Sequence, residues 1–309
     1  MAVDTRTLAP DPGTSASFRA WGSGIAAALQ ACGLTQTGDT GQINWSTVTS
    51  PNSQAVNNFL SNGYEVYAFS DALQATAPCY IRIDYGSWKS SGSPTYTCGL
   101  AVTVGTSTNG AGTITGNSSG TFQLLEQFSI NPCSNYTSGS SNRISQLFNI
   151  YGVSLSGVSS SASSCYWTVE RSKDSTGNDT GDFIYFAIHT STYGPSANGT
   201  EVVLLPVSGS PITSISGSAF PAFLPGLWLQ SVFGNNVYVF AHYPTDITIH
   251  NPIMNQLTYF TTDFVAGTAV AVTIYGATHT YMPLGQAAVK SGNCLVGQNG
   301  STSLMMLWE

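Results

Sequence analysis

Charged residues are scarce in this sequence. Asp, Glu, Lys and Arg make up 7% of its 309 residues, against roughly a quarter of an average soluble domain. The 8 Lys and Arg are outnumbered by 15 Asp and Glu, and they form no basic run that could neutralise consecutive phosphates. The composition therefore argues against nucleic-acid binding. Hydrophobic residues reach 42% and aromatic residues 11%, which excludes an intrinsically disordered chain.

Long apolar runs are missing as well. No stretch approaches the roughly 18 to 20 consecutive apolar residues of a membrane-spanning helix. The N-terminal sequence MAVDTRTLAPDPGTSASF contains no basic-then-apolar signal peptide. We therefore expect no membrane span, and we expect the chain to be made and folded in a cytoplasm.

The six cysteines lack the spacing of a zinc site. They form no C-x-x-C pair and have no histidine at ligand spacing, so zinc binding is disfavoured. Their even number leaves a disulfide framework open, although a reducing compartment would keep the thiols free. Cys133 and Cys165, which lie beside loops rich in serine and asparagine, are the best candidates for a pair.

Three other cysteines, Cys32, Cys79 and Cys98, are expected on apolar faces, where they would be buried and reduced. A hairpin turn centred near Ser91 would place Cys98 opposite Tyr85, away from Cys79. The sequence therefore favours free thiols at these positions.

Residues 14–32 have helical periodicity. Thr14, Ser15 or Ser17 can serve as the N-cap, and Gly33 is the expected stop. The apolar side of this helix is expected to pack on the strands that follow, because a membrane-surface helix would carry more basic residues. The apolar residues at spacings of three and four are Phe18, Trp21, Ile25, Ala28, Leu29 and Cys32.

The remaining sequence has the pattern of short β-strands between turns rich in Gly, Ser and Asn. Segments 64–69 and 79–86 are rich in aromatic and β-branched residues, and Ile81 and Ile83 alternate with polar neighbours. These patterns predict a mainly β fold, an antiparallel β-sandwich or jelly-roll-like architecture with one N-terminal α-helix. Further strands are predicted within 100–116, 165–172, 182–189, 201–207, 236–243, 245–250, 256–264, 269–276 and 302–309.

The expected domain organisation has three parts. Residues 1–13 contain two prolines and few apolar residues, and they are predicted to form an extended N-terminal arm. Residues 14–155 would form a module of the helix and β-strands, and residues 156–309 a second β module. The serine-rich segment 154–164 is the best candidate for a linker, but a loop inside a single domain is the alternative.

The triplet Asp-Thr-Gly occurs twice, at Asp39 and at Asp179. In aspartic proteases each half of the molecule contributes one such aspartate to a pair that shares a proton. Those carboxylates are buried and follow apolar strands, whereas the segments GLTQTG and SKDSTGN that precede Asp39 and Asp179 are turn sequences. We therefore expect two solvated turn residues, whose replacement by Asn changes stability little, and no protease.

Other catalytic and binding patterns are equally weak. Glu65 and Asp84 could form a carboxylate pair like that of a glycosidase, but a ladder of surface polar residues is the favoured interpretation, with Arg82 and Asp84 as a structural ion pair. The segment GTSTNGAG has the glycines of a phosphate-binding loop without its lysine and helix, so a hairpin turn is expected.

The four histidines are too scattered to indicate a metal site. His242 and His250 share a segment with Asp246, and all three are expected to cap strands or face solvent, as are His189 and His279. The sequence therefore predicts no catalytic residue, no cofactor and no metal site.

Residues 18–45 (FRAWGSGIAAALQACGLTQTGDTGQINW), continuing through GYEVYAFSDALQATAPCYIRIDYGS to VGTSTNGAGTITG, resemble virion structural proteins of tailed bacteriophages. The segments WTVERSKDSTGNDTGDFIYF, GATHTYMPLG and SLMMLWE are similar to the same group. The resemblance implies a component of the tail, neck, baseplate or capsid without enzymatic activity. Within it, residues 39–45 would be a turn and strand entry. The segments NPCSNYTSGSSNRI and SSSASSCYW have no counterpart, and loops are expected there.

A structural role in a virion implies partners. These would be copies of the chain itself and other virion proteins, because obligate interfaces favour aromatic and uncharged surface. Residues 1–13 would lie on a neighbouring subunit. One alternative is an adhesin that binds host-surface carbohydrate, with Tyr64, Tyr67 and Trp88 as exposed stacking platforms. A more remote alternative is a polysaccharide-degrading enzyme.

Overall fold

The computed structural model of the chain describes residues 1–51, 59–89, 96–123, 132–149, 164–173, 178–190, 200–205, 212–213, 230–231, 238–239, 257–260, 269–274, 277–286 and 303–308. In these parts the chain forms one α-helix, one 3-10 helix and the strands β1 to β19. The predicted mainly β fold with one N-terminal α-helix is confirmed.

Every pair of neighbouring strands in the described sheets is antiparallel, and most neighbours in a sheet are also neighbours in the sequence. Sheet A consists, in spatial order, of β1 (Ala2–Leu8), β8 (Cys133–Ser140), β9 (Arg143–Asn149), β10 (Ser164–Lys173), β11 (Asp179–Thr190), β12 (Thr200–Leu205) and β13 (Ile212–Thr213). Sheet B consists of β2 (Thr35–Gln36), β3 (Leu60–Ala68), β4 (Tyr80–Lys89), β5 (Tyr96–Thr108) and β6 (Ile114–Ser118), and β7 (Phe122–Gln123) also pairs with β5.

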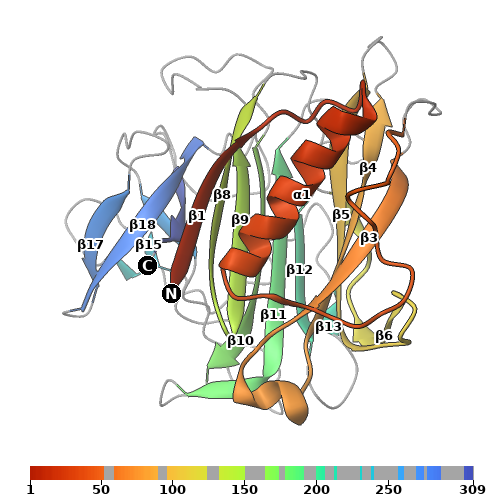
Figure 1. Cartoon of the computed structure of the whole chain (residues 1–309). Helices are drawn as coiled ribbons and strands as arrows, with labels where there is room; N and C mark the ends of the chain where they lie inside the picture. The colour runs from red at the N-terminus through yellow and green to blue at the C-terminus, as the bar shows by residue number, and fades with distance from the viewer. Residues whose placement is uncertain are drawn as a thin grey trace.

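Sheets A and B face each other and enclose the hydrophobic core, and α1 (Ser15–Ala31) lies across the opening between β1 and β3 (Figure 1). This arrangement is the predicted β-sandwich with a helix at one side. From sheet B the core contains Tyr67, Ile81, Ile83, Tyr85, Leu100, Val102 and Val104. From sheet A it contains Ile144, Phe148, Trp167, Val169, Phe183, Tyr185 and Ala187.

The helix α1 is capped and packed as its sequence predicts. Thr14 is the N-cap, and its hydroxyl accepts a hydrogen bond from the backbone N–H of Ser17, whose own hydroxyl completes a capping box. Gly33 follows the helix with φ of 105°, a conformation that favours glycine. All six predicted apolar residues of the stripe are buried. The helix contacts β1 and β8, so its packing on strands is confirmed.

The predicted strands at 64–69, 79–86, 165–172 and 182–189 correspond to β3, β4, β10 and β11. The segment 131–144, expected to form loops, instead contributes to the hairpin of β8 and β9 in sheet A. Its serine- and asparagine-rich sequence lacks the alternation of apolar and polar residues that identifies a strand. The Ser-rich segment up to residue 163, the centre of the hairpin loop at 174–177 and the predicted strand 245–250 lie outside the described residues.

The N-terminal arm is part of this chain's own fold. Residues Ala2–Leu8 pair with β8 over their whole length and form the edge of sheet A. The expectation that residues 1–13 lie on a neighbouring subunit is therefore wrong for this segment. The pairing of β9 with β10 also crosses the boundary that we expected at 155/156, so one sheet contains strands from both sides of it.

Sheet C lies beside sheet A, on the side away from sheet B (Figure 1). Trp308 packs edge-on against Tyr136 of β8, with the ring centroids 6.0 Å apart. The strands of sheet C, in spatial order, are β14 (Gln230–Ser231), β15 (Tyr238–Val239), β16 (Leu257–Phe260), β19 (Ser303–Leu307), β18 (Ala277–Gln286) and β17 (Val270–Ile274). Among the described residues, no helix has the length and apolar character needed to cross a membrane.

Cys32, Cys79 and Cys98 are buried and free, as the sequence predicts. Cys98 lies opposite Ser87 and not opposite Tyr85, because the hairpin turn falls further along the chain than expected. Burial raises the pKa of the Cys32 thiol to about 12.

The proposed partners Cys133 and Cys165 lie on β8 and β10, with β9 between them. Two strand spacings amount to about 9.6 Å, which exceeds the Cα separation of about 7 Å that a disulfide tolerates. The backbone of sheet A therefore excludes this pairing.

Candidate functional site

Asp39, in the loop after β2, connects that loop to the hairpin between β5 and β6. Its carboxylate accepts hydrogen bonds from the hydroxyls of Thr37 and Thr108 and from the backbone N–H of Gly112, the last at 2.9 Å. Asp39 is 9% exposed, so it is no solvated turn residue as the sequence suggested. Burial acts to raise the pKa of Asp39, but these hydrogen bonds together outweigh it and lower the pKa.

Asp179, the aspartate of the second Asp-Thr-Gly triplet, is the first residue of β11 and not part of a turn. Its Oδ2 accepts a hydrogen bond of 2.6 Å from the side-chain amide of Asn142. Asp39 and Asp179 therefore have separate partners, one beside sheet B and the other in sheet A. With its pKa lowered by three donors, Asp39 is an ionised acceptor and not one half of a pair that shares a proton.

Glu65 and Asp84 lie on opposite faces of sheet B. Glu65 is directly opposite Ile83, whose side chain is in the core, whereas Asp84 is directly opposite Tyr64. Because successive side chains of a strand point to opposite faces, Glu65 points into the core and Asp84 points away from it. These two carboxylates cannot form the pair of a glycosidase, and Glu65 is not part of a surface ladder.

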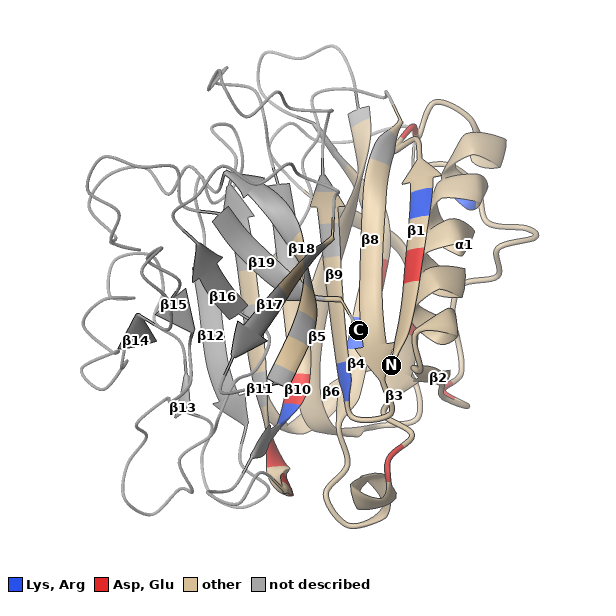
Figure 2. Ribbon diagram, turned by 90° about the vertical axis from the view of Figure 1, so that its left-hand side faces the viewer, with Lys and Arg blue, Asp and Glu red and all other residues tan. Residues whose placement is uncertain are grey.

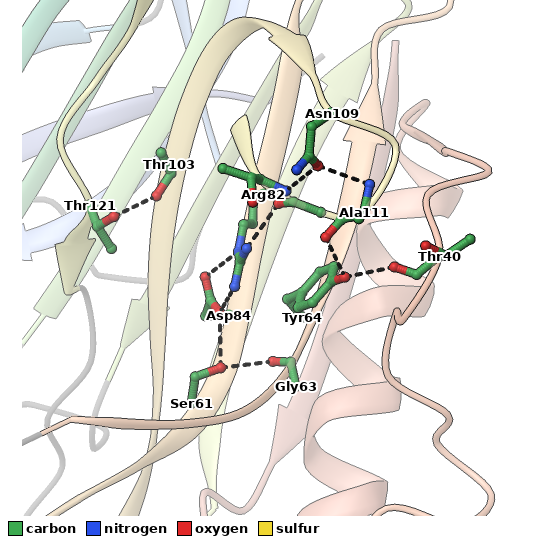
Figure 3. A network of polar contacts seen from close by, with 12 residues as sticks. Thr40, Ser61, Gly63, Tyr64, Arg82, Asp84, Thr103, Asn109, Ala111 and Thr121 are labelled. Carbon is green, nitrogen blue, oxygen red and sulfur yellow. Dashed lines mark hydrogen bonds and ion pairs between the residues drawn. The ribbon is translucent and has the colours of Figure 1, made fainter. Parts of the chain in front are cut away.

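The outer face of sheet B carries a network of polar contacts (Figure 3). Arg82 forms a two-pronged ion pair with Asp84, with N···O distances of 2.6 and 2.8 Å, which confirms the predicted pair. The hydrogen bonds to Asp84 raise the pKa of Arg82. The Ser61 hydroxyl donates to the same carboxylate at 2.9 Å. The guanidinium also donates to the carbonyl of Gly112 and therefore holds the β5–β6 hairpin on the sheet.

Tyr64 sits beneath this guanidinium, which lies 4.1 Å from the ring centroid. The Tyr64 hydroxyl donates to the carbonyls of Thr40 and Ala111, so it joins the loop after β2 to the β5–β6 hairpin (Figure 3). One face of the ring is thereby occupied within the protein. Tyr67 is fully buried, and the side chain of Trp88 lies outside the described residues. The proposed sugar-stacking platform is therefore wrong for Tyr67 and is not formed as expected at Tyr64.

Glu65 is enclosed in the core by three donors. Its Oε1 accepts from the indole N–H of Trp45 at 3.0 Å, and its Oε2 accepts from the hydroxyls of Tyr67 at 2.6 Å and Tyr85 at 2.7 Å. Glu65 itself is 2% exposed. Burial raises the pKa of Tyr67 and of Tyr85, and the neighbouring carboxylate adds to both shifts, so both phenols remain donors. Both carboxylate oxygens are therefore already in use.

A second buried charge joins sheet A to the connection between β3 and β4. The guanidinium of Arg171 is fully buried, and it forms a two-pronged ion pair with Asp71, next to the 3-10 helix η1 (Ala72–Ala75). It also donates to the backbone carbonyls of Ala77 and Gly181 at 2.6 and 3.0 Å. This set of partners satisfies the guanidinium, which is the condition under which a buried charge is tolerated.

The histidines give no metal site in the part of the chain that the structure describes. No group of three or more His, Cys, Asp or Glu side chains lies together there. His189 and His279 are on β11 and β18, while His242, His250 and Asp246 lie outside the described residues.

Two groups of polar residues escaped the sequence analysis. Of the donors around Glu65, Tyr67 lies two residues away on the same strand, but Trp45 and Tyr85 come from other segments and no spacing in the sequence links them to it. The buried residues Asn135, Thr137 and Gln146 belong to β8 and β9, which had no strand pattern. Asn135, Thr137 and Gly139 lie two residues apart, as residues on one face of a strand do. They are polar or small, so this spacing did not indicate a buried strand face.

Comparison with protein-family models, with curated proteins and with solved structures gives no match to this chain. Its function therefore has to be argued from its own residues.

Proposed function

We propose that this chain is a structural component of a virion of the tailed-phage type, which acts through permanent association with copies of itself and with other particle proteins. The observation that carries the proposal is the distribution of charge. Every Asp, Glu and Arg whose side chain the structure describes is buried or half-buried. The exposed positions of these parts are occupied by uncharged residues.

The described charges are used for contacts inside the fold. Arg82 and Arg171 pair with Asp84 and Asp71, and Glu65 is surrounded by donors. Figure 2 shows how few positions of the described strands are charged. A freely diffusing protein gains solubility from exposed charge, whereas stable interfaces are depleted of Lys, Glu and Asp. An uncharged exterior therefore suits a protein that is covered by partners.

The exposed positions of α1 are also occupied by uncharged residues. They include Ala16, Ala20, Ala27 and Ala31, where Glu and Lys would also be good helix formers, although Ala is the best. The resemblance of residues 18–116 to tailed-phage structural proteins is our reason for proposing a virion of this type as the assembly.

The proposal is tested in two steps. Sedimentation velocity on the purified full-length chain over a wide concentration range should show a stable oligomer, since an interface of the standard kind buries on the order of 1,600 Å². An antibody raised against the chain should then label intact particles from the producing bacterial strain in electron micrographs. A chain that stays monomeric at the highest concentration and does not label or co-purify with particles would refute the proposal.

A glutamate scan of exposed uncharged positions provides the control. Ala20→Glu on α1 and Ala111→Glu on the β5–β6 hairpin add a charge without entering the core. A variant at an interface should lose association while its far-UV circular dichroism is unchanged, and a variant elsewhere should keep both. Unchanged association in every folded variant of such a scan would contradict a role for the uncharged surface.

A further inference from the structure

Four side chains lie in one row across sheet A, on the face that points into the core. Asp4 on β1 is directly opposite Thr137 on β8, Thr137 is opposite Gln146 on β9, and Gln146 is opposite Trp167 on β10. Directly opposite residues of antiparallel strands share a face, with Cβ atoms about 4.5–5.5 Å apart. Thr137, Gln146 and Trp167 are completely buried. A hydroxyl, a side-chain amide and an indole N–H thus meet in a water-free environment.

The contacts orient the amide between its two neighbours. Nε2 of Gln146 donates hydrogen bonds to Oγ1 of Thr137 at 3.2 Å and to Oδ1 of Asn135 at 3.4 Å. Oε1 of Gln146 accepts a hydrogen bond of 3.2 Å from the indole N–H of Trp167. The Thr137 hydroxyl donates to Oδ1 of Asn135 at 3.1 Å. The amide nitrogen is therefore on the side of the hydroxyl, and the carbonyl oxygen is bound by a donor that would stabilise negative charge on it.

We propose that Thr137 and Gln146 become joined by an intramolecular ester bond. In this step Oγ1 of Thr137 attacks Cδ of Gln146, and the negative charge that develops on Oε1 is stabilised by the Trp167 N–H. The C–N bond of the amide breaks, the hydroxyl proton moves to the leaving nitrogen, and one ammonia is released. No oxidant, reductant or cofactor is consumed.

In the proposed step Asp4, the carboxylate of this row, assists removal of the hydroxyl proton once that proton leaves Oδ1 of Asn135. The carboxylate of Asp4 is paired with Arg6, with an N···O distance of 2.7 Å, and its position in the row is next to Thr137. General-base assistance of this kind raises the nucleophilicity of a hydroxyl, and the fixed juxtaposition of hydroxyl and amide replaces a bimolecular encounter.

A buried donor in the same cluster has no acceptor. Asn135 is 1% exposed, and its Nδ2 atom has no hydrogen-bond partner in the described structure. Unsatisfied buried groups are rare in native proteins, and a catalytic role is one of the explanations for them. The cluster is thus not explained as a set of fully satisfied structural hydrogen bonds.

The cross-link would fix the register of β8 and β9. These strands lack the apolar alternation that normally specifies register, and a slip of one residue would turn every side chain to the other face. A covalent bond between directly opposite residues excludes such a slip. The inference concerns this chain alone and does not depend on its assembly into a particle.

Mass spectrometry of the purified native chain tests the proposal. Loss of ammonia lowers the intact mass by about 17 Da, as expected for acyl transfer from an amide to a hydroxyl. A succinimide at one of the Asn-Gly pairs would lower the mass equally, so the bond must also be located. These pairs are Asn62-Gly63, Asn109-Gly110, Asn198-Gly199 and Asn299-Gly300. Trypsin cleaves after Lys89, Arg143 and Arg171. Peptides 90–143 and 144–171 should remain joined after denaturation and should separate on treatment with hydroxylamine, which cleaves esters.

Variants assign the roles. Thr137→Val should restore the full sequence mass and give separate peptides, Thr137→Ser should keep the link, and Asp4→Asn should slow its formation. Thr168→Val, on the opposite face of the same sheet, is the matched control and should keep the link. Separate peptides 90–143 and 144–171 from the native wild-type chain would overturn the proposal, whatever the variants do.

Discussion

At the scale of single residues, the charges of this protein are held by hydrogen bonds inside the fold. Glu65 is the clearest case, since two tyrosine hydroxyls and an indole N–H surround one carboxylate. Hydrogen bonds to an ionised acceptor are about twice as strong as neutral ones. The strength of this arrangement depends on the charge as well as on the shape of the side chain.

Replacing Glu65 by Gln tests this dependence. The amide preserves the shape but removes the charge and offers one acceptor fewer, so we expect a loss of about 2 kcal/mol in the free energy of unfolding. Tyr67→Phe, which removes one donor and keeps the ring, should cost about 1 kcal/mol. Both losses can be measured by urea denaturation monitored by fluorescence. A Gln variant as stable as the wild type would show that the carboxylate is not held in this way.

Asp39 predicts a pH dependence of stability. Its pKa in the folded chain lies below the ordinary value of 3.8, so the unfolded chain takes up its proton first as the pH falls. The stabilisation by Asp39 is therefore fully present above pH 3.8 and is lost as the pH falls through the lower, folded value.

Asp39→Asn should accordingly lower stability at neutral pH by about 1–2 kcal/mol, because a charged acceptor of several hydrogen bonds is lost, and it should flatten the acid limb of the stability profile. Asp179→Asn is the matched control at the other Asp-Thr-Gly triplet, where the side-chain amide of Asn142 donates to the carboxylate. Thermal unfolding measured between neutral pH and pH 3 would reveal the difference, and identical profiles for wild type and Asp39→Asn would contradict it.

At the scale of elements, the β5–β6 hairpin depends on a close approach of backbone to an aromatic ring. Gly112 has φ of 83°, and a Cβ atom there would lie 2.0 Å from Cε2 of Tyr64. Gly110, in the same turn, has φ of 77° but no atom within 4 Å of such a Cβ. Substitutions at these two glycines therefore distinguish the cost of backbone strain from the cost of a steric clash.

Gly110→Ala should cost about 1 kcal/mol through backbone strain alone. Gly112→Ala adds the clash with Tyr64 and should cost about 2–4 kcal/mol, in the range of overpacking in a rigid site. Comparison of the two midpoints in chemical denaturation provides the test. Equal losses would show that the hairpin does not rest on Tyr64.

The strand β1 belongs to the fold itself, so its removal should destabilise the chain. Deletion of residues 1–8 removes the partner of β8 and the surface against which α1 packs. We expect a lower melting temperature and a broader transition by circular dichroism. Thr5→Ala and Thr7→Ala, on the exposed side of the same strand, should each change stability by less than about 0.5 kcal/mol. A truncated chain that melts like the full chain would show that β1 contributes nothing.

The elements that the sequence predicted correctly are those with an apolar pattern. The helix had a stripe from Phe18 to Cys32 and strong capping residues, and β4 had alternating isoleucines. Of the elements that were missed, β1 is recognised by its pairing across a long separation of sequence, such as Thr5 with Tyr136. The hairpin of β8 and β9 pairs locally, but it lacks the alternation of apolar and polar residues that identifies strands. The contacts of Glu65 were harder to predict than the strands, because the face of sheet B to which Glu65 points follows from the register of β3 on β4.

At the scale of the whole molecule, the lack of charge at the exposed positions of the described residues affects how the protein should respond to its solvent. Dissolved salt weakens attraction between exposed charges over about 10 Å at 0.1 M, but the described charges are enclosed or half-enclosed. The self-association that we propose should therefore change little in sedimentation experiments between low and moderate sodium chloride.

Uncharged surfaces respond to different conditions. Excluded anions such as sulfate strengthen the burial of apolar groups, and cooling weakens it. An assembly held by the uncharged surface of the described residues would therefore tighten in ammonium sulfate and loosen in the cold, whereas screening by the same salt would loosen a particle held together by ion pairs.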